Sequence, residues 1–170
     1  MGRLTADMGL TLVYGGAKVG LMKILADSAL KAGGEVIGVI PSKLVEKEIA
    51  HNGLSDLHIV DSMHERKAMM AALSDVFIAL PGGIGTLEEF FEVLTWTQLG
   101  FYQKPCGILN VNGYFDLLEQ FLDNCVAQRF VTATHRDMII ASVQPEDLLA
   151  KLSACQVEPS DKWLDTFADL

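Results

Sequence analysis

Residues 76–89 have the sequence Val76-Phe-Ile-Ala-Leu-Pro-Gly-Gly-Ile-Gly-Thr-Leu-Glu-Glu89, in which a short apolar run leads into a glycine-rich turn. The apolar run predicts a buried strand over 76–80, because a strand covered on both faces carries apolar residues on both. The pattern beyond the turn predicts a helix over 87–99. A strand, a short turn and a helix in direct succession are typical of an α/β fold.

The same alternation of apolar run, turn and helical pattern continues along the chain. We predict further strands over 11–14, 36–40, 57–60, 106–111 and 138–141, and further helices over 21–32, 62–73, 114–128 and 145–154. The strands are continuous apolar runs, which indicates a mostly parallel sheet flanked by helices. The sequence therefore predicts a Rossmann-like three-layer sandwich, formed as a single domain over residues 1–170, with ligands at the carboxyl ends of the strands.

Composition excludes several classes of protein. The net charge of −9 argues against a nucleic-acid partner but not against a small anionic ligand, which interacts with local groups. No apolar run reaches the ~18 residues of a membrane span, and the N-terminus has no signal pattern, so we expect a cytoplasmic protein. Cys106, Cys125 and Cys155 lie far apart, and neither they nor the histidines have the spacing of metal ligands.

The turn Pro81–Gly85 can bring bare backbone close to a ligand, because its glycines lack a Cβ atom. A helix that opens at Thr86 would add unpaired N–H groups, and together these make an anion site. The structural alternative is a capping box, with Thr86 as the N-cap and Glu89 three residues later. The spacing alone leaves both interpretations of Glu89 open.

A second motif, Met63-His-Glu-Arg-Lys67, opens the helix predicted over 62–73. Ser62 can cap this helix, with Glu65 at the third position. One stripe of the helix surface carries Met63, Arg66, Met70 and Leu73. We expect Arg66 to point inward, where a guanidinium needs a carboxylate or phosphate partner. The alternative is an arginine at the edge of the stripe that extends to water.

The segment Gly15-Gly-Ala-Lys-Val-Gly20 resembles a dinucleotide-binding fingerprint, with Ala17 in place of the middle glycine. A tight turn between strand and helix needs glycines without any ligand. The acidic residue expected at the end of the next strand is missing, since Ile40-Pro41 stands there. The fingerprint is therefore a weak indication of a dinucleotide.

The two motifs Pro81–Glu89 and Met63–Lys67 together resemble the LOG family, the cytokinin riboside 5′-monophosphate phosphoribohydrolases, many of which were once labelled lysine decarboxylases. The similarity extends over residues 10–129. It includes Val13-Tyr-Gly-Gly16, Val19-Gly-Leu-Met22, Gly38-Val-Ile-Pro41, Trp96-Thr-Gln-Leu-Gly100 and Asn110-Val-Asn-Gly-Tyr114.

The resemblance implies a homodimer that hydrolyses the N-glycosidic bond of a cytokinin riboside 5′-monophosphate or an AMP-like nucleotide, without a cofactor. It implies that Arg66 and Glu89 are the catalytic pair. The substrate-binding residues that it implies are Glu48, Lys67, Gly82, Gly83, Gly85, Thr86 and Glu88. A non-catalytic nucleotide-binding module of the same fold is the alternative. A pyridoxal-phosphate decarboxylase is a third hypothesis, for which no lysine has an identifiable cofactor environment.

The sequence departs from the family pattern at two places. Ala17 stands where many members carry a third glycine. Members also begin with a strand, a Gly-Ser-rich turn and the first part of a helix, whereas residues 1–9 resemble the end of that helix. We therefore expect the family's first strand, an interior one beside residues 11–14, to be lacking.

Overall fold

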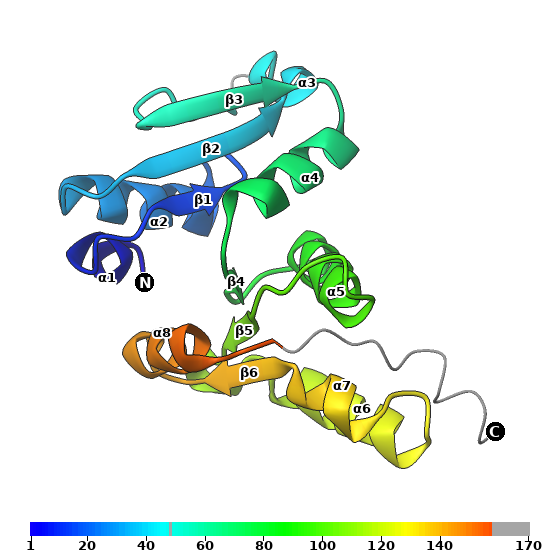
Figure 1. Ribbon diagram of the computed structural model, residues 1–170. Helices are drawn as coiled ribbons and strands as arrows, with labels where there is room; N and C mark the ends of the chain where they lie inside the picture. The colour runs from blue at the N-terminus through cyan, green and yellow to red at the C-terminus, as the bar shows by residue number, and fades with distance from the viewer. Residues whose placement is uncertain (48, 158–170) are drawn as a thin grey trace. The chain divides into compact units, whose positions relative to one another are not determined.

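The computed structural model describes residues 1–47 and 49–157. The chain forms two compact units, Met1–Ser74 and Asp75–Leu170 (Figure 1). Every pairing between the named strands is parallel, and helices flank both sheets. The prediction of an α/β fold with parallel strands is confirmed. The prediction of a single domain over residues 1–170 stays a prediction.

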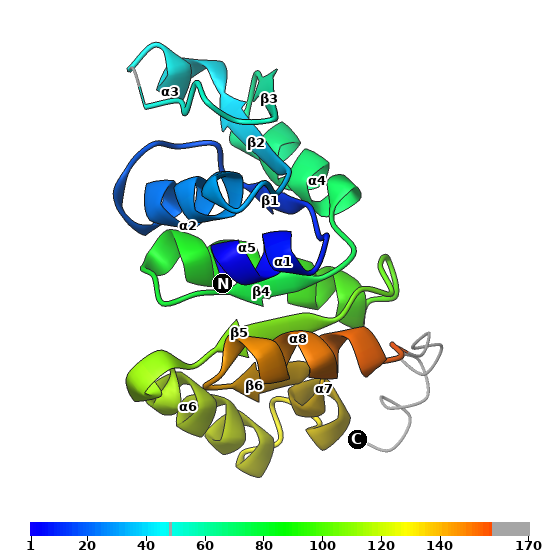
Figure 2. The ribbon, with the colours of Figure 1, turned by 90° about the vertical axis from the view of Figure 1, so that its left-hand side faces the viewer.

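The first unit contains a three-stranded sheet of order β1-β2-β3. Its elements are α1 (Gly2–Asp7), β1 (Leu12–Tyr14), α2 (Gly20–Lys31), β2 (Val36–Pro41), α3 (Ser42–Val45), β3 (Asp56–Val60) and α4 (Met63–Leu73). Helix α2 packs against β1 and β2, and α4 packs against all three strands. Figure 2 shows these two helices on opposite faces of the sheet. The buried core between α2 and the sheet is formed by Tyr14, Ala26, Ala29 and Val36.

The second unit contains a three-stranded sheet of order β4-β5-β6. Its elements are β4 (Phe77–Ala79), α5 (Ile84–Gln98), β5 (Cys106–Leu109), the 3-10 helix η1 (Val111–Gly113), α6 (Asp116–Ala127), α7 (Ala133–Asp137), β6 (Ile139–Ser142) and α8 (Pro145–Ala154). Helix α5 packs against β4 and β5, while α8 packs against β5 and β6 from the other side (Figure 1). Its fully buried side chains include Ile108, Phe115, Leu148 and Leu152.

Each predicted strand is present, with bounds that differ by a residue or two from the expected ones. The short elements α3, η1 and α7 were not predicted, because segments this short carry no helical periodicity. Within residues 1–47 and 49–157, none of the helices combines the length and the apolar character needed to cross a bilayer.

The parallel sheets determine where the turns of interest lie. Gly15 follows the end of β1, and in the second unit Pro81–Gly85 follows β4 while residues 110–114 follow β5. Because β4 and β5 are parallel neighbours, the last two turns lie at the same edge of their sheet. This edge is where an α/β sheet binds its ligands.

Candidate active site

Helix α4 begins with the predicted cap. The Ser62 hydroxyl accepts a hydrogen bond from the Glu65 backbone N–H at 3.1 Å. The Glu65 carboxylate accepts one from the Asp61 N–H at 2.9 Å, which closes the helix start on both sides. This cap fixes the first turn of α4 and therefore the position from which Arg66 leaves the helix.

Arg66 points inward, as predicted, with only 9% of its surface exposed. Its Nε donates a hydrogen bond to the Val39 carbonyl at 3.1 Å, and its Nη1 lies 3.8 Å from the Met63 sulfur. The alternative of an arginine extended to water is therefore wrong. The predicted inward stripe is also wrong in part, because Met63 and Leu73 are exposed, whereas Arg66 and Ala71 are the buried residues of α4.

The packing of the Arg66 guanidinium against the backbone explains the glycine at position 15. A Cβ atom at Gly15 would lie 1.8 Å from Arg66 Nη2, so the guanidinium would have to move. Gly16 has a φ of +70°, and a Cβ there would lie 3.2 Å from that of Ile40. Packing and backbone conformation thus account for both glycines without a ligand.

The backbone of the turn after Gly15 is tied to residues 49–51. The Lys18 N–H donates to the Ile49 carbonyl at 2.8 Å, and the His51 N–H donates to the Gly16 carbonyl at 2.9 Å. An isolated antiparallel bridge joins Ala17 to Ala50. The turn is held by the protein itself, which favours the structural interpretation of the fingerprint over a dinucleotide site.

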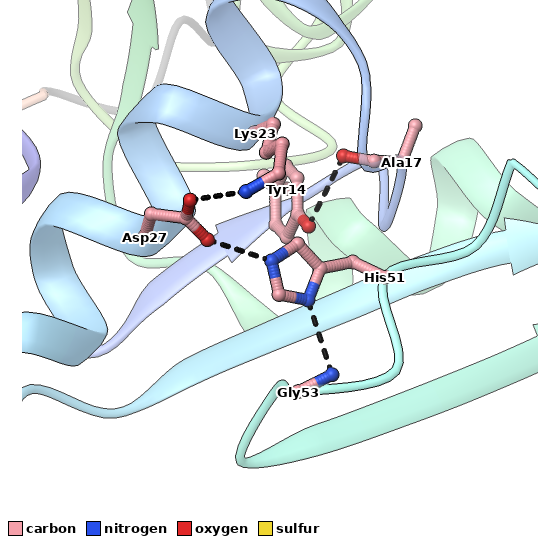
Figure 3. Close-up of polar contacts among 6 residues, drawn as sticks. All are labelled: Tyr14, Ala17, Lys23, Asp27, His51 and Gly53. Carbon is pink, nitrogen blue, oxygen red and sulfur yellow. Dashed lines mark hydrogen bonds and ion pairs between the residues drawn. The ribbon is translucent and has the colours of Figure 1, made fainter.

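A polar network around His51 holds this turn against α2 (Figure 3). His51 Nδ1 accepts the Gly53 N–H at 3.1 Å, so the ring proton is on Nε2, which donates to Asp27 at 2.9 Å. Hydrogen bonds from Lys23 and then His51 lower the pKa of Asp27 to about 2. Burial, with a smaller contribution from Asp27, raises the pKa of Tyr14 to about 12, and its hydroxyl donates to the Ala17 carbonyl.

The glycine turn of the second unit leads directly into α5. This helix begins at Ile84 with Gly83 as its N-cap, so Thr86 is its third residue and Glu89 its sixth. The capping-box alternative is therefore wrong, because Thr86 is already inside the helix and the first turn contains no acidic residue. The physical reason is the extended backbone of Gly83, which lets the helix begin before Thr86.

The glycines of this turn differ in what requires them. A Cβ at Gly82 would lie 2.3 Å from Thr86 Oγ1, so packing requires Gly82. At Gly83 and Gly85 no atom lies within 4 Å of such a Cβ, and neither has a positive φ. The Leu87 N–H donates to the Gly83 carbonyl at 3.2 Å, and the N–H groups that precede it in α5 have no partner within the helix. Bare backbone in front of a helix N-terminus is the geometry of an anion site.

Glu89 lies three residues after Thr86 and four after Gly85, on the same side of α5. Glu89 is half-buried and Glu88 is exposed. The carboxylates of Glu88 and Glu89 are therefore not caps of α5, and the functional interpretation of Glu89 stays a prediction.

The remaining predicted site residues divide between the units. Arg66 and Lys67, which is half-buried, belong to the first unit, and the glycine turn with Glu88 and Glu89 belongs to the second. Glu48 lies outside the described residues. The structure therefore groups the predicted residues into two sets, one on α4 and one on the first turns of α5.

Other reactive groups in the described part of the chain do not suggest a site. No set of three or more His, Cys, Asp or Glu residues within 1–47 and 49–157 is arranged to hold a metal ion. Burial raises the pKa of the Cys106 thiol to about 11, which makes it a poor nucleophile.

The fold and the glycine turn define a Rossmann-like α/β protein, and the relatives of the chain define its family. A sequence model of the family described as "possible lysine decarboxylase" matches residues 22–152. The cytokinin riboside 5′-monophosphate phosphoribohydrolase of Rhodococcoides fascians is 50% identical over 153 residues, which is 89% of this chain and 77% of that protein. The chain belongs to this family, the LOG family.

Plant relatives carry the same enzyme name. Cytokinin riboside 5′-monophosphate phosphoribohydrolase LOG1 of Arabidopsis thaliana is 44% identical over 89% of this chain and 71% of that protein. The probable phosphoribohydrolase LOGL5 of Oryza sativa subsp. japonica is 45% identical, and the match covers 95% of this chain but 65% of that protein.

Among solved structures, a molybdenum cofactor binding protein from Rippkaea orientalis is similar, with a TM-score of 0.68 and 27% identity. The match covers 90% of this chain and 82% of that one. The molybdenum cofactor carrier protein of Chlamydomonas reinhardtii has a TM-score of 0.62 at 23% identity over 88% of this chain and 84% of that chain, and supports the fold alone.

We expect Gly15→Ala to lower the free energy of unfolding by about 1–3 kcal/mol, because the added methyl group must displace the Arg66 guanidinium. Denaturant titration measures this. Gly85→Ala is the matched control and should not lower the free energy of unfolding, because no atom lies within 4 Å of its Cβ and alanine is the better helix former. Equal stability of the two variants would contradict the role assigned to Gly15.

We expect the His51 network to make stability depend on acid pH. The pKa of Asp27 in the folded protein, about 2, is below its ordinary value of 3.8, so its contribution is present above pH 3.8 and is lost as the pH falls through 2. Asp27→Asn should therefore show a smaller loss of stability over this range, measured as urea midpoints. Asp7→Asn, at an exposed position of α1, should follow the unsubstituted protein. If the urea midpoint of Asp27→Asn falls with pH in parallel with that of the unsubstituted protein, the network is not a source of stability.

Proposed function

We propose that this chain hydrolyses the N-glycosidic bond of a cytokinin riboside 5′-monophosphate or an AMP-like nucleotide, and releases the free base and ribose 5-phosphate. The observation that carries this proposal is the 50% identity with the phosphoribohydrolase of Rhodococcoides fascians over 77% of that protein. The open glycines Gly83 and Gly85 at the start of α5 support it, because a phosphate group needs such a site.

The chemistry assigns different tasks to the two proposed catalytic residues. Breaking an N-glycosidic bond develops positive charge on the sugar. A carboxylate beside the ribose stabilises this charge and can activate water, and Glu89 is the residue we assign to this task. Arg66 cannot act as a proton donor, because a guanidinium does not lose its proton in a protein. We assign Arg66 to orienting the substrate and the carboxylate.

Substrate binding depends mainly on the phosphate. We propose that Gly82, Gly83, Gly85 and Thr86 hold it with backbone N–H groups and the threonine hydroxyl, while the α5 dipole favours its negative charge. Binding energy from this distant group then aligns the bond that breaks. Lys67, Glu88 and Glu48 are proposed to contact the rest of the substrate.

Two expectations from the family remain proposals. One is the homodimer. The other is the sandwich that lacks the family's first strand beside β1. It is supported by the position of β1, which within the described residues lies at the edge of its sheet and pairs with β2.

The alternative is a nucleotide-binding module of the same fold that has no turnover. It is favoured by one observation, the similarity in fold to a protein described as a molybdenum cofactor binding protein. The fold alone therefore does not select hydrolysis. The higher identity of the phosphoribohydrolases, 50% against 27%, favours the enzyme.

We expect the purified protein to release free base from AMP or its N6-isoprenylated analogue, but not from the corresponding ribosides, when the products are separated by chromatography. Glu89→Gln should lower kcat by at least about 100-fold, because it removes the charge that the reacting sugar needs. Glu88→Gln, the neighbouring carboxylate, should change KM more than kcat. Turnover unchanged in Glu89→Gln would refute that residue's role, and tight nucleotide binding without base release would favour the module.

The pairing of Arg66 with Glu89 is tested by combining substitutions. If the two residues act on the same step, the loss in kcat for Arg66→Lys with Glu89→Gln together will be smaller than the product of the two single losses. Strictly multiplicative losses would mean that they act independently.

At Gly85 we expect a substitution to weaken substrate binding without lowering stability. Gly85→Ala should leave the free energy of unfolding unchanged or raise it by up to about 1 kcal/mol, since alanine is the better helix former. Its KM should rise about tenfold or more, which corresponds to about 1.4 kcal/mol of lost phosphate binding. Gly82→Ala, in contrast, should destabilise the protein by about 1–3 kcal/mol, because its Cβ meets Thr86. An unchanged KM in Gly85→Ala would remove this turn from the binding site.

A further inference from the structure

Tyr114 contacts the glycine turn from the neighbouring strand end. Its hydroxyl donates a hydrogen bond of 2.7 Å to the Gly82 carbonyl, although the two residues are 32 positions apart in the chain. Gly82 directly precedes Gly83, the N-cap of α5. The turn after β5 thus has a polar contact with the turn to which we assign phosphate binding.

The position of Tyr114 is fixed by the buried side chain of Asn110, which is 6% exposed. Asn110 Nδ2 donates to the carboxylates of Asp116 at 2.8 Å and Glu119 at 2.9 Å, and Asn110 Oδ1 accepts the Phe115 N–H at 2.7 Å. Both amide hydrogens and the amide oxygen are therefore used. These bonds hold the turn after β5 on both sides of Tyr114.

The backbone and the aromatic neighbour leave Tyr114 little freedom. Gly113 has a φ of +72°, and a Cβ there would lie 2.5 Å from an Asp116 carboxylate oxygen. The Tyr114 ring meets the ring of Phe115 edge to face, with centroids 5.0 Å apart, and Phe115 is buried. The hydrogen bonds of Asn110 and the ring contact with Phe115 therefore support the orientation in which the Tyr114 hydroxyl meets Gly82.

The hydrogen bond that the Gly82 carbonyl accepts also affects the Gly83 N–H, because both groups belong to the same peptide. In a trans peptide the C=O and N–H groups point in opposite directions, so fixing the Gly82 carbonyl also fixes the direction of the Gly83 N–H. The bond polarises the peptide and makes that N–H a better donor. It also restrains a turn whose glycines would otherwise lose more conformational entropy when a ligand binds.

We propose that Tyr114 is a positioning residue of the phosphate site, which it acts on through the Gly82–Gly83 peptide. This inference rests on the proposed function, since it assumes that the glycine turn binds the 5′-phosphate. Tyr114 contacts the turn and orders its donors, and the ligand group it serves is a phosphomonoester.

The test is Tyr114→Phe, which removes the hydroxyl and keeps the ring on Phe115. We expect KM for the nucleoside monophosphate to rise about fivefold, as the loss of one hydrogen bond predicts, while kcat changes less than about twofold. The thermal midpoint should not change, because Tyr114 is 55% exposed. Tyr102→Phe is the matched control in the same unit, where the ring packs on Trp96, and its KM should equal that of the unsubstituted protein.

Ligands with and without phosphate separate positioning from a general structural effect. In Tyr114→Phe the dissociation constant of ribose 5-phosphate should rise by the same factor as KM, and that of adenine should stay constant. An equal rise for adenine, or no rise for ribose 5-phosphate, would overturn the proposal.

The same binding measurement distinguishes this inference from the proposed function. If the protein binds ribose 5-phosphate but releases no base, hydrolysis is refuted, and a weaker ribose 5-phosphate complex in Tyr114→Phe still supports Tyr114. If the unsubstituted protein does not bind ribose 5-phosphate, the Tyr114 proposal is overturned.

Discussion

Parallel strands end at the same edge of a sheet, and the turns of the second unit depend on this constraint. Strands β4 and β5 pair in parallel, with Ala79 opposite Ile108. The residues that follow each strand therefore emerge side by side, although they are far apart in the chain. The hydrogen bond between Tyr114 and Gly82 follows from this register and could not form if either strand were reversed. The first unit obeys the same rule, since β1 and β2 are parallel and Gly16 lies near Val39 and Ile40.

Glycines at these strand ends have two different causes. At Gly15 and Gly82 a neighbouring side chain occupies the space of the Cβ atom, so the protein's own packing favours glycine there. At Gly83 and Gly85 the space is open and the backbone is ordinary. Gly83 is the N-cap, a position that favours glycine, so it is at Gly85, inside α5, that glycine weakens the helix start without a packing reason. A residue type that costs stability and serves no neighbour is best explained by an approaching ligand.

The sequence predicted what local patterns determine. The strands, the Ser62 cap and the inward direction of Arg66 follow from periodicity and capping chemistry. The start of α5 was predicted too late, because Thr86 has the residue type of a cap, while Gly83, the actual N-cap, has no side chain to reveal it. The contacts of His51 with Asp27 and of Tyr114 with Gly82 span 24 and 32 residues, and no local pattern contains them. Only the packed strands bring these residues together.

The proposed site separates binding from chemistry in a way that follows from the residues involved. The proposed phosphate binding uses backbone N–H groups, which the glycines leave open to a ligand and whose peptide accepts the Tyr114 hydrogen bond. The proposed chemistry uses two charged side chains, each positioned by its own helix: Arg66 by the capped start of α4, and Glu89 by its place one turn after Gly85 in α5. Because a helix start fixes position to within a fraction of a turn, the caps Ser62 and Gly83 decide where both charges stand. A shift of one residue in either helix start would rotate its charged residue by about 100° about the helix axis, which is enough to abolish the role proposed for it.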